Sequence, residues 1–113
     1  MSFENISENI SVNKIFEGYA EQLADEEGLD FIILSENENF LEFEILGIPK
    51  NTTEPSYKIP REETILFVRE LVEKLTADYP KYQWKNHINL AGSPNEPASI
   101  YIDYKLLLEN KID

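Results

Sequence analysis

The chain of 113 residues has no cysteine, one histidine and four glycines, and its 10 basic residues are outnumbered by 22 acidic ones. The absence of cysteine excludes disulfide bonds, thiolate metal ligands and a cysteine nucleophile. A single histidine leaves little for zinc or copper coordination. The few glycines form none of the motifs that cradle a phosphate group, so a nucleotide-binding loop is excluded as well.

The formal net charge of −12 argues against direct binding to nucleic-acid phosphates or to an anionic membrane. Hydrophobic residues make up 42% of the chain, which is enough for a core and excludes a disordered acidic tail. The length fits one domain, residues 1–113. Apolar runs such as Phe31–Leu34 do not exceed four residues and are too short to span a membrane, and the start of the chain does not resemble a signal peptide. We therefore expect a cytoplasmic protein, in which the sequons at Asn5, Asn9 and Asn51 are chance matches.

The first predicted helix covers residues 12–26. Apolar side chains from Val12 to Leu23 recur at the spacing of one buried helical face, and Gly28 is typical of the position just after a helix end. A tandem repeat of Glu-Asn-Ile-Ser precedes this helix. Four residues repeated once do not define a repeat fold, so residues 1–11 are expected to form a loosely ordered lead-in or a weak first helical stretch.

The second predicted helix covers residues 61–79. Pro60 and the acidic residues that follow it are typical of a helix start, and Pro80 ends the pattern. Opposite charges four residues apart indicate that its outer face is solvated. The positions expected to be buried are Ile65, Val68, Leu71, Val72, Leu75 and Tyr79.

Alternating apolar and polar residues predict four strands. Residues 30–35 and 40–46 are separated by a short turn rich in Asn and Glu, which predicts an antiparallel hairpin. Residues 82–90 and 100–104 alternate in the same way and are joined by a loop rich in Gly, Ser and Pro. The tail, residues 106–110, fits either a strand extension or a last helical turn.

The element order is therefore α-β-β-α-β-β, an α+β fold. Two amphipathic helices cannot bury their apolar faces alone, and each hairpin has one apolar face. The arrangement that buries all of these faces is a four-stranded, mostly antiparallel sheet with two helices packed on one face.

The negative charge is concentrated in the first 48 residues. They contain twelve acidic residues and one base, Lys14, for a net charge of −11, whereas the rest of the chain is almost neutral. Glu17, Glu21 and Asp25 follow one another at intervals of four on the first helix, where like charges destabilise the helix. This repulsion favours a surface that attracts a basic partner. The expected partner-binding residues are Glu17, Glu21, Asp25, Glu26, Glu27, Glu42 and Glu44.

Three other patterns suggest chemistry, and none of them completes a motif. His87 has no motif that would supply a nucleophile and an orienting carboxylate, so we expect a surface histidine and no enzyme. Segment 25–30 is rich in carboxylates but lacks the spacing of an EF-hand loop, so no metal site is expected. Tyr82 and Trp84 lie near two lysines, yet their alternation places them in the core and not on a nucleic-acid-binding face. No cofactor is expected.

The charge distribution predicts a protein that binds a basic protein, in the form of an inhibitor or immunity protein that neutralises a basic toxin or nuclease. An active site that holds phosphate must be basic, and an acidic inhibitor can compete for it. One alternative is a phage-type nucleic-acid mimic, which would bind many basic proteins. Another is an accessory or chaperone-like domain whose charge serves only solubility.

Overall fold

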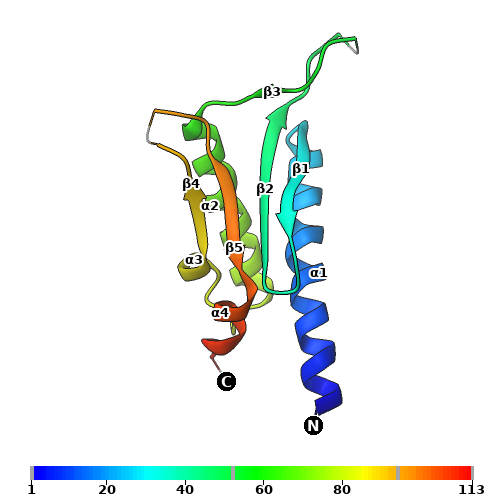
Figure 1. Cartoon of the computed structure of the whole chain (residues 1–113), viewed down its shortest axis with the longest axis vertical. Helices are drawn as coiled ribbons and strands as arrows, with labels where there is room; N and C mark the ends of the chain where they lie inside the picture. Colours follow the sequence, from blue (N-terminus) through cyan, green and yellow to red (C-terminus); the bar gives the residue numbers. More distant parts are fainter. Residues whose placement is uncertain (1, 52, 94, 113) are drawn as a thin grey trace.

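The computed structural model describes residues 2–51, 53–93 and 95–112, with side chains from Val12 onward. One layer is an antiparallel sheet and the other is formed by helices, as expected for the α+β class (Figure 1). In chain order the elements are α1 (Ser2–Glu26), β1 (Leu29–Glu36), β2 (Phe40–Gly47), β3 (Tyr57–Lys58), α2 (Arg61–Asp78), α3 (Trp84–His87), β4 (Ile88–Ala91), β5 (Ser99–Asp103) and α4 (Tyr104–Glu109).

The four main strands lie in the order β1-β2-β5-β4, and all their pairings are antiparallel. The two hairpins therefore meet along β2 and β5, where Phe43 lies opposite Ile100. This leaves β1 and β4 at the two edges. The two-residue strand β3 lies between β2 and α2 in the chain and pairs with the end of β2. The predicted four-stranded sheet is confirmed, with β3 as a small addition.

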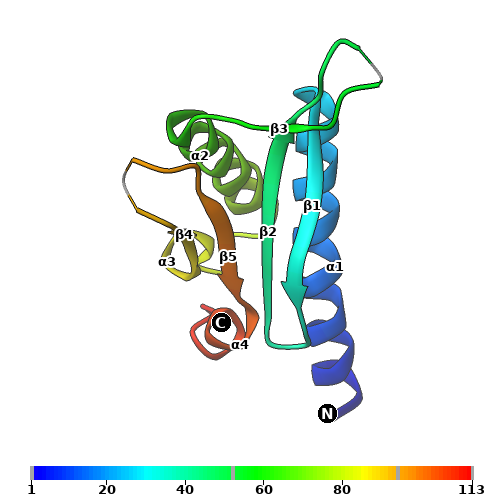
Figure 2. The same cartoon turned by 45° about the horizontal axis from the view of Figure 1, so that its top comes forward.

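Both long helices cover the same face of the sheet, as predicted. In Figure 2, α1 lies behind β1 and β2, and α2 lies next to it on the same side. The side chains of β2 alternate accordingly, with Leu41, Phe43 and Ile45 buried under the helices. The aromatic ring of Phe16 on α1 lies at the centre of this core, with its centroid 5.9 Å from that of Phe43, 6.1 Å from Trp84 and 6.2 Å from Tyr104.

Helix α1 is longer than the sequence pattern predicted. It begins at Ser2 and includes the tandem repeat, so the repeat continues the helix and is not a loose lead-in. At the other end, the predicted stop is confirmed, because Gly28 has a φ of 71° and its backbone N–H donates to the carbonyl of Asp25 at 3.1 Å.

Helix α2 has the predicted extent, but its buried face is rotated. The buried side chains are Thr64, Phe67, Leu71 and Leu75, whereas Ile65 is 37% exposed. Val68, Val72 and Tyr79 are only partly buried. The run from Ile65 to Val68 is apolar at every position, so the periodicity alone did not determine which of these residues faces the sheet.

The predicted strand over 82–90 is wrong in its first half. Residues Trp84–His87 form the single helical turn α3, and only Ile88–Ala91 pair as a strand. Two local hydrogen bonds close this turn, because both the backbone N–H and the side-chain amide of Asn86 donate to Gln83. Trp84 is nevertheless buried, as expected, and its indole N–H donates to the carbonyl of Tyr79 at 3.1 Å.

The tail is helical, which decides between the two readings left open by the sequence. The carboxylate of Asp103 caps α4 by accepting a hydrogen bond from the backbone N–H of Leu106 at 2.9 Å. Over the described ranges, no helix is both long and apolar enough to span a membrane.

Candidate partner-binding surface

The acidic row predicted on the first helix lies alongside the edge strand β1. Glu21 and Asp25 line a shallow groove together with Leu29 and Phe31 at the start of β1. Glu17, one turn earlier on the helix, contacts Glu36 at the end of β1. The row therefore runs antiparallel to β1 for the length of the strand. We call α1 from Glu17 to Asp25, together with β1, the α1–β1 surface.

The groove between the helix and the edge strand combines apolar and acidic walls. Its volume is about 480 Å³, and its lining residues are Gly18, Glu21, Gln22, Ala24, Asp25, Leu29 and Phe31. Gly18 lies in the middle of α1, and no heavy atom of the surrounding side chains would come within 4 Å of a Cβ at this position. Packing therefore does not require a glycine here, although glycine weakens a helix relative to alanine. The effect of Gly18 is to keep the groove open.

At the other end of the row, the carboxyl group of Glu17 is hydrogen-bonded to that of Glu36. Burial, the hydrogen bond with Glu36, and the negative charges of Glu36 and Glu21 together raise the pKa of Glu17 from 4.5 to about 7. The hydroxyl of Tyr104 is buried near this pair and has no hydrogen-bond partner among the described groups. Burial, reinforced by the two carboxylates, raises the pKa of Tyr104 above its usual range. At this end of the surface, two carboxyl groups therefore lie close together in a partly buried position.

Strand β1 exposes the apolar run that the sequence pattern would place in a core. Ile32, Ile33 and Leu34 are 38%, 41% and 48% exposed, and they follow one another in a strand that has only one neighbour in the sheet. A β-bulge between Ile33 and Ser35 interrupts the pairing with β2 at Leu34. Exposed apolar strand edges are typical of surfaces that meet another protein.

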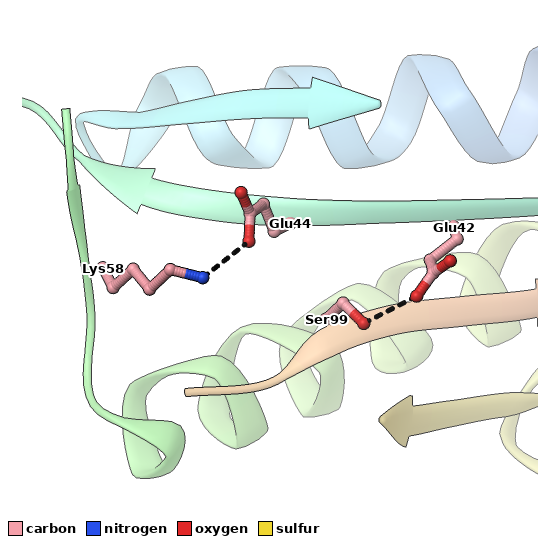
Figure 3. A network of polar contacts seen from close by, with 4 residues as sticks. All are labelled: Glu42, Glu44, Lys58 and Ser99. Atoms are coloured by element: carbon pink, nitrogen blue, oxygen red, sulfur yellow. Dashed lines mark hydrogen bonds and ion pairs between the residues drawn. The ribbon is translucent and has the colours of Figure 1, made fainter. Parts of the chain in front are cut away.

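Two of the predicted binding residues, Glu42 and Glu44, lie on the opposite face of the sheet. Both point away from the helices, as their alternation predicted, but neither is unpaired (Figure 3). Ser99 donates its hydroxyl hydrogen to Glu42 at 2.9 Å, and the ammonium of Lys58 lies 3.6 Å from the carboxylate of Glu44. Both acids therefore have a partner within the chain. They do not share a surface with the row on α1.

Glu26 and Glu27 form a third group, at the end of α1 that faces α2. The carboxylate of Glu26 lies 3.7 Å from the ammonium of Lys74. Glu27 is hydrogen-bonded to Glu70, and this contact is the main reason why its pKa is raised. The seven predicted residues thus fall into three places, and only Glu17, Glu21 and Asp25 lie along the β1 edge.

The structure also places the three other groups of residues that the sequence suggested for chemistry. His87 ends α3 at the far side of the sheet, half-buried, and its Nε2 atom has no hydrogen-bond partner in the described structure. Tyr82 and Trp84 are buried and do not form an exposed aromatic face. In the acidic segment after α1, Asp30 accepts a hydrogen bond from the hydroxyl of Ser56. Among the described residues, no three His, Cys, Asp or Glu side chains are grouped so that they could hold a metal ion.

Sequence reasoning missed the strand side of this surface. A run of apolar residues normally predicts a buried strand, so nothing in the sequence indicated that Ile32–Leu34 would be exposed. Glu36 was missed because only the fold brings it to Glu17. Gly18 did carry a signal, since a glycine inside a helical pattern calls for a packing or functional reason.

No protein-family model, curated protein or solved structure matches this chain. The case for a function therefore depends on the charge and geometry of the α1–β1 surface.

Proposed function

We propose that this chain is a protein-binding protein whose α1–β1 surface holds a basic surface of another protein. The specific form we favour is an inhibitor or immunity protein that neutralises a cationic toxin or nuclease. The observation that carries the proposal is the row of Glu17, Glu21 and Asp25 beside the exposed apolar edge of β1.

The row is costly to the free protein, and neither of the ion pairs found among the described residues involves it. Like charges one helical turn apart destabilise a helix by about 0.2–0.5 kcal/mol for each pair. Lys14 is the only base in the first 48 residues. At Glu17, burial and the neighbouring carboxyl groups of Glu36 and Glu21 together raise the pKa to about 7, so the carboxyl still holds a proton below that pH. A cation from a partner would replace this proton and relieve the repulsion, which supports a role in binding.

The exposed apolar side chains of β1 can supply the affinity that a row of charges does not. Charges steer two proteins together and set the association rate, but they add little affinity where water screens them. Affinity comes mainly from apolar side chains that are buried at the centre of the interface. Ile33 lies opposite Phe43, on the helix side of the sheet, and is 41% exposed beside the row, so it can serve as such a centre. Ile32 lies opposite Glu44 and points to the other face.

A basic enzyme is the partner that this combination fits best. An enzyme that cleaves nucleic acid needs a positive active site to hold phosphate, and that field attracts an acidic protein. An inhibitor that presents a row of carboxylates competes directly with the substrate for the same cationic groups.

The proposal is tested by capture from a lysate with three forms of the full chain. The row variant carries Glu17→Gln, Glu21→Gln and Asp25→Asn. The control variant carries Glu73→Gln, Glu96→Gln and Glu109→Gln, three exposed acids that lie on α2, on the β4–β5 loop and on α4. Both variants replace three carboxyl groups by amides, so they differ in where on the surface the carboxyl groups are removed.

The proposed function predicts one main basic protein that wild type and the control variant retain and that the row variant loses. A nucleic-acid mimic would instead capture many unrelated basic proteins. If wild type and both variants capture the same proteins equally, the charge of the row serves solubility and the proposal is wrong.

A further inference from the structure

We propose that the partner presents an extended basic segment, which adds to the outer edge of β1 as a new strand and places a lysine or arginine side chain in the groove between α1 and β1. This inference rests on the proposed function and specifies how the basic partner is held.

The outer edge of β1 is available for strand addition. In the described structure no strand pairs with β1 on the side away from β2. From Leu29 to Ile33 the strand pairs with β2 in unbroken register, from Leu29 opposite Gly47 to Ile33 opposite Phe43. Within this regular stretch, every second residue points its backbone N–H and C=O groups to the outer edge, and an extended peptide can pair with such an edge.

The edge has little of the protection that sheet proteins use against pairing with other chains. Edge strands are commonly blocked by lysine, by proline or by a bulge near the middle. β1 contains neither lysine nor proline, and its bulge comes only after Ile33. Instead it exposes three successive apolar side chains, Ile32 to Leu34.

Charge complementarity selects the occupant. A second copy of this chain would bring its own net charge of −12, and edge-to-edge pairing would place two acidic rows close together. A segment with lysine or arginine would instead meet Glu21 and Asp25 on one side of the edge. The same acids that oppose self-association thus favour a basic strand.

The groove provides a place for a long basic side chain. Side chains of an added strand would alternate between the two faces of the sheet, so every second one would point toward α1. There, Leu29 and Phe31 offer an apolar surface for the aliphatic stem, while Glu21 and Asp25 offer carboxylates for the charged end. The absence of a side chain at Gly18 leaves the entrance open.

The test uses the full chain labelled with nitrogen-15 and a synthetic probe peptide of eight residues in which lysine alternates with valine. A control peptide has the same sequence with N-methyl groups on alternate backbone nitrogens of one edge. The control keeps the charge and side chains but cannot donate hydrogen bonds to a strand edge. We expect the probe to shift the amide signals of Leu29–Ile33 and to slow their hydrogen exchange. We expect the N-methylated peptide to bind at least about tenfold more weakly, since the loss of even one backbone hydrogen bond has about this effect.

Two variants separate this inference from the proposed function. Gly18→Leu keeps a good helix former while filling the groove, and it should weaken binding of the probe without unfolding the chain. The row variant should weaken both peptides alike, because it removes charge and leaves the strand edge intact. If the row variant binds the probe as tightly as wild type does, the electrostatic claim of the proposed function is wrong.

Five results would overturn the proposal. Equal binding of the N-methylated peptide, or shifts confined to α1, would mean that charge alone holds the peptide. Unchanged binding by the Gly18→Leu variant would exclude the groove. Absence of probe binding at millimolar concentration would show that the edge accepts no such strand. A dimer in sedimentation equilibrium, with slowed exchange in β1 before any peptide is added, would make a second copy the occupant.

Discussion

Replacing Glu36 by glutamine should change how the stability of the protein depends on pH. In the wild type the two carboxyl groups of Glu17 and Glu36 are hydrogen-bonded, and the pKa of Glu17 is raised from 4.5 to about 7, with burial as the largest cause. Glu17 in the folded chain therefore holds a proton that the unfolded chain has already released. Its stabilising contribution is complete below pH 4.5 and is lost as the pH rises from 4.5 to 7.

The size of this effect follows from the position of Glu17 on the surface. Without screening by solvent, a rise in pKa from 4.5 to about 7 corresponds to roughly 3 kcal/mol of unfolding free energy. Glu17 is only half-buried, however, and solvent screening reduces such interactions strongly, so we expect about 1 kcal/mol. In Glu36→Gln the new amide can donate a hydrogen bond to ionised Glu17, and one of the two negative charges is gone. Burial of Glu17 is the same in the variant, so the variant should be more stable than wild type by at most about 1 kcal/mol at pH 8 and equal to it at pH 4.

Urea denaturation at intervals between pH 4 and pH 8 measures this difference, and carbon-13 spectra of the glutamate carboxyls follow the titration of Glu17 directly. Glu38→Gln is the matched control, since it removes the same charge from an exposed position two residues further along the hairpin. It should change stability by a few tenths of a kcal/mol at most, with no step between pH 4.5 and 7. Titration of Glu17 near 4.5 in the wild type, or the same pH profile for both variants, would refute the reasoning.

Three further substitutions test the surface and the core. Gly18→Ala should raise the unfolding free energy by about 0.5–1 kcal/mol in thermal denaturation, because the position is helical and has room for a Cβ, and a loss of stability would contradict this. Phe67→Ala should cost about 3–5 kcal/mol in urea denaturation and Ile65→Ala less than about 1 kcal/mol, and the reverse order would restore the helix face predicted from sequence. His87→Ala should leave capture of the partner unchanged, since His87 adjoins the opposite edge strand; lost activity at full stability would instead favour an enzyme.

Much of the fold was predictable because it depends on local signals. Gly28 ends α1 in the left-handed conformation that glycine adopts most easily. The side chain of Asn37 closes the first hairpin by accepting hydrogen bonds from the backbone N–H groups of Asn39 and Phe40. Alternation in β2 then determined that Leu41, Phe43 and Ile45 face the helices. These features need only a few neighbouring residues and the period of a strand or helix.

The candidate site was predictable only on its helical side. The spacing of Glu17, Glu21 and Asp25 shows directly that they share one face of a helix. Which strand lies beside that face depends on the order of the sheet, and no local pattern encodes it. For the same reason the exposure of the apolar residues in β1 could not be predicted, because a strand at an edge and a strand at the centre have similar sequences.

The association rate constant of the captured partner, measured from low salt to about 0.5 M, tests the central claim most directly. If the acidic row on α1 steers a basic partner, the row variant associates more slowly than wild type and the control variant at low salt. The difference should shrink as the ionic strength rises past about 0.1 M, where exposed charges are screened beyond about 10 Å. Dissociation should change less than association. Equal association rates and equal salt dependence for all three proteins would contradict the claim that the α1–β1 surface binds through its charge.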